Sequence, residues 1–251
     1  MITEGQEIAG GNGSGAKLAR EGVNQVVDAN RRGTAKLPRI TTVIFDYGHV
    51  LSAVPGPEDF EPIRNALGAD ALTFQNLYWR NRDAYDFDSL DAYGYFQAMG
   101  KELGVTYSPE QLRHLAMLDS DIWVTPNPIM VEWVRALRGH GFKTAVLSNM
   151  SRNVGDRLRR EAKWMESFNH LCFSGELKVG KPDPLIFHSC LKALGVTAEE
   201  SLFIDDREAN IQAAAAVGMP GVVFRTPHEL EADLKPYGLA ESLAEVLART
   251  R

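Results

Sequence analysis

Short apolar runs alternate with longer amphipathic stretches along most of this chain of 251 residues. The run TTVIFD at residues 41–46 is rich in β-branched residues and lacks alternating polar positions, which is typical of a parallel strand covered on both faces. Helical periodicity fills the segments between such runs. Strands that alternate with helices predict an α/β fold built on a doubly wound parallel sheet. The predicted strands are 41–46, 143–148, 169–173, 201–205 and 221–224.

The segment from residue 57 to residue 121 has helical periodicity but no convincing strand. We therefore expect residues 56–124 to form a helical cap inserted into an α/β core of residues 39–55 and 125–251. Residues 1–38 differ, because GGNGSG is linker-like, and they are expected to be a flexible extension without chemistry of its own. The helices of the cap are predicted near Pro57–Leu67, Ala71–Asp83, Leu90–Leu103 and Pro109–Leu118, and those of the core near 128–140, 151–164, 182–194, 208–217, 230–234 and 241–248.

Composition narrows the class of function. The formal net charge is −6, from 27 basic and 33 acidic side chains, so nothing resembles a basic nucleic-acid-binding face. No apolar run is long enough to cross a membrane. Cys172 and Cys190 do not form a disulfide framework and are expected to be buried in a reducing compartment, for which cytoplasm is the default. An acidic protein that handles an anionic substrate needs a local cation, such as a metal ion or a placed lysine.

Polar side chains occupy four places where a predicted strand ends or a predicted helix begins. Asp46, at the end of the first strand, is one of them. The carboxyl ends of parallel strands share one edge of the sheet, where open α/β folds bind their ligands. For Asp46 alone two interpretations remain open. It is either a carboxylate compensated by a metal, a cation or backbone donors, or a residue that caps the following turn. The other members of the set are Ser148 with Asn149, Lys181 before a proline-started helix, and Asp205 with Asp206.

This set of side chains suits phosphoryl transfer to a carboxylate. Asp46 would attack phosphorus and form an aspartyl-phosphate. Nucleophile and phosphate are both anionic, so Mg²⁺ held by Asp46 and Asp206 would offset their repulsion. The hydroxyl of Ser148 could hold non-bridging oxygens, and Lys181 would neutralise charge on the transferring group.

The motifs resemble those of the haloacid dehalogenase (HAD) superfamily, whose hydrolases have an aspartate nucleophile on a Rossmann-like core. The resemblance covers roughly residues 40–227. GELKVGKPDPLIFHSCLKALGV and SLFIDDREANIQAAAAVGM are highly specific for it. FDYGHVL and YWRNRDAYD are most similar to the branch that includes the N-terminal phosphatase domain of epoxide hydrolase and glucose-1-phosphate phosphatases. The matching residues are Asp46 in motif I, Ser148 in motif II, Lys181 in motif III, and Asp205 and Asp206 in motif IV.

The resemblance implies a role for each matched residue. Asp46 is the nucleophile, and the metal ligands are its carboxylate, the carbonyl of Gly48 and Asp206. Asp205 belongs to the metal site through an outer contact. Asn210, one helical turn after Asp206, steadies the acidic pair.

Gly48 is where this chain departs from most HAD phosphatases. They carry at this position a second aspartate, which protonates the leaving group. The general acid is therefore in question, a role usually worth ~10²–10⁴-fold in rate. His49 could replace it, since a histidine titrates in the useful range, or it could pack locally. Metal-bound water, or a substrate with a good leaving group, could suffice in place of such an acid.

The segment YWRNRDAY places aromatic and basic residues on one cap helix. Its aromatic side chains are expected to pack the cap, Trp79 among them, while Arg80 or Arg82 could face the crevice and bind an anionic substrate. Asn149 is a further candidate for substrate binding. Trp123 and Trp133 are expected to pack where the cap rejoins the core.

The leading hypothesis is a Mg²⁺-dependent phosphatase that hydrolyses a small phosphorylated metabolite, such as a sugar phosphate. One alternative is a 2-haloacid dehalogenase, in which Asp46 attacks carbon. The Asp205–Asp206 pair argues against it, because that family needs no metal. Another alternative is a HAD-fold binding protein with weakened catalysis, supported by Gly48 alone. The sequence does not identify the substrate or the oligomeric state.

Overall fold

A parallel sheet forms the centre of residues 39–250, the part of the chain that this computed structural model describes. The strand order is β3-β2-β1-β4-β5, and each neighbouring pair is parallel. The predicted doubly wound α/β fold is confirmed. The predicted extension, residues 1–38, lies outside the described residues. The strands are β1 (Thr42–Phe45), β2 (Lys143–Ser148), β3 (His170–Phe173), β4 (Ser201–Asp205) and β5 (Gly221–Val223).

Strand β1 lies in the middle of the sheet, between β2 and β4. All four of its residues are buried, as its apolar and β-branched composition requires. The register aligns Phe45 with Val146 on one side and with Ile204 on the other. After β3 the chain passes from one side of β1 to the other, where β4 begins the second half of the sheet. The carboxyl end of β1 is therefore the switch point at which such sheets bind ligands. Asp46 follows β1 at this point.

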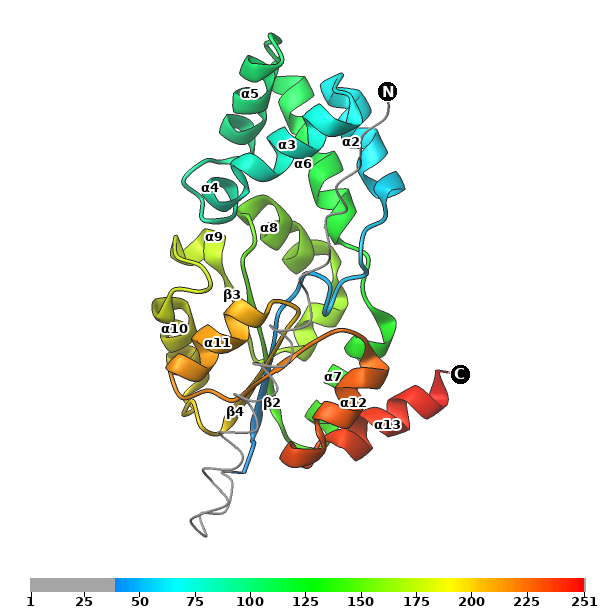
Figure 1. Cartoon of the computed structure of the whole chain (residues 1–251), viewed down its shortest axis with the longest axis vertical. Helices are drawn as coiled ribbons and strands as arrows, with labels where there is room; N and C mark the ends of the chain where they lie inside the picture. The colour runs from blue at the N-terminus through cyan, green and yellow to red at the C-terminus, as the bar shows by residue number, and fades with distance from the viewer. Residues whose placement is uncertain (1–38, 251) are drawn as a thin grey trace, which may run out of the picture. The chain divides into compact units, whose positions relative to one another are not determined.

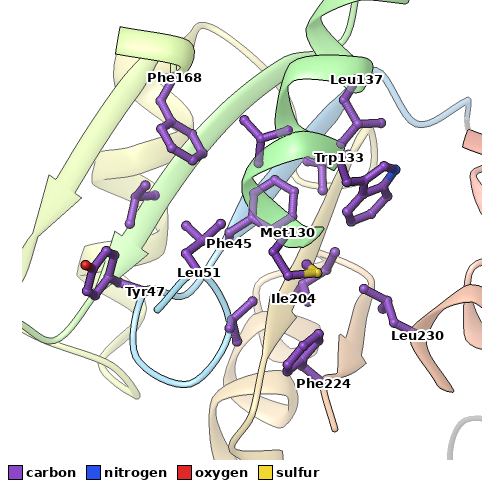
Figure 2. Close-up of a cluster of buried hydrophobic side chains, with 14 of the residues drawn as sticks. Phe45, Tyr47, Leu51, Met130, Trp133, Leu137, Phe168, Ile204, Phe224 and Leu230 are labelled. Carbon is purple, nitrogen blue, oxygen red and sulfur yellow. The ribbon is translucent and has the colours of Figure 1, made fainter. Parts of the chain in front are cut away.

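Alternate strand residues pack on opposite faces of the sheet. On one face, Phe45 packs edge-on against Trp133 of α7 (Pro128–Gly139), with ring centroids 5.5 Å apart (Figure 2). Trp133 is thus a core residue of the sheet and does not pack at the junction with the inserted helices. The other helices on this face are α8 (Arg152–Glu161), α12 (Pro227–Asp233) and α13 (Ala240–Arg249), with the short turns η2 (Lys163–Ser167) and η3 (Lys235–Tyr237) nearby.

The opposite face is covered by α10 (Pro184–Leu194) and α11 (Glu208–Ala216). Ile44 and Phe203 point to this side, and Phe203 packs edge-on against Phe187 of α10. Cys172 and Cys190 are free, buried thiols in the same cluster. A short helix, α9 (Ser174–Leu177), follows β3. Among the helices of residues 39–250, none has the length and apolar character that a membrane crossing needs.

A group of helices is inserted in the chain after β1 and before β2, and it lies at the upper end of the view in Figure 1. It has a hydrophobic cluster of its own, in which Tyr78, Tyr95 and Phe96 are buried. The helix predicted over residues 71–83 is interrupted at Asn81, which leaves the helical conformation. The elements are η1 (Pro57–Phe60), α2 (Glu61–Leu67), α3 (Ala71–Arg80), α4 (Arg82–Asp86), α5 (Ala92–Glu102) and α6 (Pro109–Trp123).

The two chain segments that join these helices to the sheet lie side by side. Ser52 and Pro126 form an antiparallel bridge, and the amide of Ala53 donates to the carbonyl of Thr125. The chain therefore leaves and re-enters the α/β core at adjacent points.

Candidate active site

A cavity of about 270 Å³ lies between the carboxyl ends of the strands and the inserted helices. Its core wall holds the residues that the sequence motifs single out. Its other wall comes from α3, α4 and the end of α6. The core wall includes Asp46, Gly48, His49, Ser148, Asn149, Lys181, Asp206, Arg207 and Asn210, and the opposite wall is formed by Trp79, Arg82, Asp83, Asp86 and Trp123.

The carboxylate of Asp46 is buried and presents its two oxygens differently. Oδ1 accepts from the amide of Tyr47 at 2.7 Å and lies 2.8 Å from Nζ of Lys181. Within residues 39–250, Oδ2 accepts no hydrogen bond, and it is open to the cavity. Burial raises the pKa of Asp46 to about 6, although Lys181 acts in the opposite direction. One oxygen is held while the other is free to react.

Lys181 is the buried cation of the site. Its Nζ lies 2.8 Å from Oδ1 of Asp46 and 2.6 Å from Oδ2 of Asp205. Burial alone would lower the pKa of Lys181, but these two carboxylates outweigh it and raise the pKa. Lys181 therefore stays charged.

The amide side chain of Asn149 fixes the main chain of Lys181. Its Nδ2 donates to the carbonyl of Lys181 at 2.8 Å, and its Oδ1 accepts from the Lys181 amide at 2.7 Å. The sequence predicts that Asn149 binds substrate. In the structure both polar atoms of its side chain hydrogen-bond to the main chain of Lys181, and Asn149 also lines the cavity, so substrate binding by Asn149 stays a prediction.

Asp205 is fully buried and has several donors. Nδ2 of Asn210 lies 3.0 Å from each of its oxygens, and the amide of Arg207 donates to Oδ1 at 2.8 Å. Nζ of Lys181 also donates to Oδ2 of Asp205. These contacts agree with an outer position for Asp205 and with Asn210 as its support. Asp206 is the more accessible member of the pair.

Three carboxylates could hold a metal ion. Asp46, Asp205 and Asp206 each offer an oxygen within 4.8 Å of the others. Carboxylate oxygens are the ligands that Mg²⁺ prefers, and Asp46 and Asp206 retain accessible oxygens. The donor set therefore fits a hard divalent cation.

His49 has an unusual backbone conformation, with φ of 60° in the left-handed region. Its ring nitrogen Nδ1 lies 3.0 Å from Oδ2 of Asp206, and its side chain is 42% exposed. The hydrogen bond that the His49 ring donates to Asp206 raises the pKa of His49 above its ordinary value, with burial acting against it. Next to it, a Cβ added to Gly48 would meet no atom within 4 Å. The space at this Cβ position is therefore open.

Ser148 ends β2 and is buried at the cavity. Within residues 39–250, its hydroxyl forms no hydrogen bond to a side chain or to the main chain. It is thus available to a ligand.

Arg82 lines the opposite wall of the cavity and belongs to a buried polar network. Its Nε donates to both oxygens of Asp86 at 3.0 and 3.1 Å, and its Nη1 donates to Asp119 at 2.9 Å and to the hydroxyl of Tyr78 at 2.7 Å. Asp119 is fully buried. Burial raises the pKa of Asp86 to about 6, with Arg82 acting against it. The charge of Arg82 is therefore matched within the protein.

Of the two arginines named as alternatives from the sequence, Arg82 is the one that lines the cavity, while Trp79 departs from its expected place. Arg80 does not line the cavity; it is exposed and pairs with Glu102. Trp79, expected to pack inside the cap, is 49% exposed and lines the cavity, as does Trp123. Sequence reasoning passed over Asp83, Asp86 and Arg207. Asp83 and Asp86 follow Trp79 at four and seven residues, a helical spacing that could have indicated a shared side.

Residues 40–218 match the haloacid dehalogenase-like hydrolase family, and the chain belongs to that family. This match covers most of the chain. It agrees with the geometry described above, in which the four motifs meet at one cavity.

Relatives of known name match only in part. The chain is 30% identical over 97 residues to a sesquiterpene phosphatase of Aspergillus oryzae, covering 39% of this chain and 50% of that protein. The chain spans between 11% and 50% of the length of the first curated relatives that it matches.

Solved structures share the fold. A HAD family enzyme from Bacteroides thetaiotaomicron in complex with magnesium and inorganic phosphate superposes with a TM-score of 0.62 at 19% identity, covering 74% of this chain and 94% of that one. The L-2-haloacid dehalogenase from Xanthobacter autotrophicus gives a TM-score of 0.59 at 21% identity, covering 82% and 87%. At such identities the likeness concerns the fold alone.

Proposed function

We propose that this protein is a Mg²⁺-dependent phosphatase that hydrolyses a small phosphorylated metabolite through an aspartyl-phosphate. The arrangement of Asp46 carries the proposal. Its Oδ1 is held by Lys181 and a backbone amide, while its Oδ2 is open to the cavity beside a carboxylate cluster. The phosphatase relative and the magnesium and phosphate in a structural neighbour support it.

The reaction runs in two steps. Oδ2 of Asp46 attacks phosphorus, the bond from phosphorus to the ester oxygen breaks, and the leaving alkoxide takes a proton. Water then attacks the aspartyl-phosphate, which releases inorganic phosphate and regenerates the carboxylate. Lys181 and the hydroxyl of Ser148 stabilise the charge of the transferring group. When bound by Asp46, Asp206 and the carbonyl of Gly48, Mg²⁺ would offset the repulsion between nucleophile and phosphate.

His49 is the proposed proton donor to the leaving group. Its ring lies at the cavity and is held by Asp206, and the usual acid is replaced by Gly48. The variant His49→Gln should lose turnover on alkyl phosphates, whose leaving groups need a proton, and keep most turnover on aryl phosphates. An equal loss on both classes would contradict this role.

The variant Asp46→Asn tests the reaction itself. It should abolish phosphate release with Mg²⁺, and mass spectrometry of the wild type with acetyl phosphate or BeF₃⁻ should find the adduct on Asp46. Asp156→Asn is a matched control, because Asp156 is exposed on α8 and does not line the cavity. Full phosphatase activity in Asp46→Asn would refute the mechanism. Halide release from 2-chloropropionate without any metal would favour the dehalogenase alternative instead.

A further inference from the structure

The two walls of the cavity differ in charge. On the core wall, Lys181 and Arg207 stand beside the carboxylates, where the proposed reaction needs the phosphate and a divalent cation. The opposite wall would face the rest of the substrate. It presents one guanidinium, Arg82, together with the carboxylates of Asp83 and Asp86.

The guanidinium of Arg82 does not make this second wall positive. Its Nε is shared by both oxygens of Asp86, and its Nη1 donates to the buried Asp119. Asp83 also lines the cavity and forms no ion pair within residues 39–250. Arg82 is thus already paired with two carboxylates, and Asp83 adds a further carboxylate at the cavity, so this wall is negative when these groups are ionised. A carboxylate or second phosphate there would be repelled.

Two indole rings lie on the same side of the cavity. Trp79 is 49% exposed, although large aromatic side chains are usually buried, and Trp123 lines the cavity from the end of α6. The guanidinium of Arg82 stands over the ring of Trp123 at 5.7 Å. Aromatic faces contact apolar or C–H surfaces and attract cations, while carboxylates accept from hydroxyl and ammonium groups.

We infer that the substrate is a phosphomonoester whose leaving group is uncharged or cationic, carries hydrogen-bond donors and has an apolar face, and that this wall discriminates against a second anionic group. The inference rests on the proposed function, and it names the class of substrate. Asp83 is its most accessible determinant, since Asp86 and Asp119 are committed to Arg82.

Three aryl phosphates that differ only in one para substituent test this inference. They carry a hydroxymethyl, an aminomethyl or a carboxylate group, so the body is neutral, positive or negative while the phenols leave with similar ease. With Mg²⁺ and wild-type protein, kcat/KM should be about tenfold lower for the carboxylate than for the hydroxymethyl ester. The aminomethyl ester should equal or exceed the hydroxymethyl ester. A carboxylate ester that reacts as well as the others would overturn the inference.

Asp83→Lys should bring the ratio of the carboxylate to the hydroxymethyl ester to about one or above, because it reverses the accessible charge of this wall. Asp156→Lys makes the same change of net charge on α8, away from this cavity, and should leave the wild-type ratio. If both variants shift the ratio equally, the discrimination comes from net charge and not from this wall.

Binding to Asp46→Asn separates this inference from the proposed function. The affinities of the three esters, measured with Mg²⁺ by calorimetry or by quenching of tryptophan fluorescence, should follow the same order. If the order of binding holds but the wild type releases no phosphate, the proposed reaction is wrong and the charge selectivity stands. If turnover is present but binding ignores charge, or if none of the esters binds, the selectivity is wrong.

Discussion

Nζ of Lys181 lies 2.8 Å from Oδ1 of Asp46 and 2.6 Å from Oδ2 of Asp205, so one ammonium group joins carboxylates that follow or end two neighbouring strands. All three groups are buried. Charges in such a place are tolerated only when they are paired and hydrogen-bonded. The same contact that makes burial possible also keeps Oδ1 of Asp46 occupied.

Lys181→Met should therefore lower the stability of the fold as well as the rate of the reaction. Removing one partner of a buried ion pair leaves an uncompensated charge and costs about 3–5 kcal/mol. We expect a loss of this size in the free energy of unfolding, measured by urea denaturation without Mg²⁺. Lys192→Met, on the exposed side of α10, should change stability little. A Lys181 variant as stable as the wild type would show that the pair does not hold the site together.

Gly48→Asp should increase turnover. The added Cβ meets nothing within 4 Å, and residue 48 does not have a left-handed φ, so neither a Cβ clash nor the backbone opposes the substitution. A carboxylic acid here can protonate the leaving group in addition to His49, and kcat on alkyl phosphates should rise, by at most about 10²-fold. Aryl phosphates, which leave without help, should change much less.

Gly48→Asn is the matched control for this gain, because it has the same size and no proton to give. An equal rise in both variants would show that the effect comes from shape. If neither variant gains activity on alkyl phosphates, the missing acid does not limit the reaction.

Mg²⁺ should raise the melting temperature of the wild type, because it relieves repulsion between Asp46 and Asp206 and binds only the folded chain. An excess of about 100-fold over Kd corresponds to about 2.7 kcal/mol of added stability. Asp206→Asn should lose most of this effect, while Asp156→Asn should keep it. EDTA should both remove the thermal shift and stop phosphate release. A shift that persists in Asp206→Asn would place the ion elsewhere.

Asp86 should make stability depend on pH. Its pKa is raised by burial from 3.8 to about 6 in the folded chain. The folded state then binds more protons than the unfolded state between these values, so this contribution to stability is full below about 3.8 and is lost as pH rises through about 6.

The variant Asp86→Asn checks this sign. The stability of this variant relative to the wild type should rise by on the order of 1 kcal/mol between about pH 5 and about pH 7, because the wild type loses stability as Asp86 ionises. The measurement is urea denaturation of both proteins across this range. A stability difference that stays constant with pH would contradict the shifted pKa.

The strands could be predicted closely because their signal is local. Residues 143–148 and 201–205 form β2 and β4 with the predicted bounds. Strand ends also fix which edge of the sheet a side chain reaches, so Asp46, Ser148, Lys181 and the acidic pair were rightly grouped from the sequence. Proximity followed from topology, while the role of each residue stays a prediction.

The helical wall of the cavity could not be predicted in the same way. Helical periodicity tells which residues share a face, but not which face meets the sheet. Arg80 and Arg82 are two residues apart, yet the first is exposed at Glu102 and the second is enclosed by carboxylates. The break at Asn81 places them on two different helices, α3 and α4.

The bridge between Ser52 and Pro126 has a consequence for how this architecture can change over time. Since the inserted helices start and finish at neighbouring points, residues can be added to or lost from them without moving any strand of the sheet. The sheet edge that carries the motif residues and the helical wall of the cavity can therefore diversify separately. Under the proposed function, new substrates would become accessible through the insertion while the reaction itself is inherited unchanged.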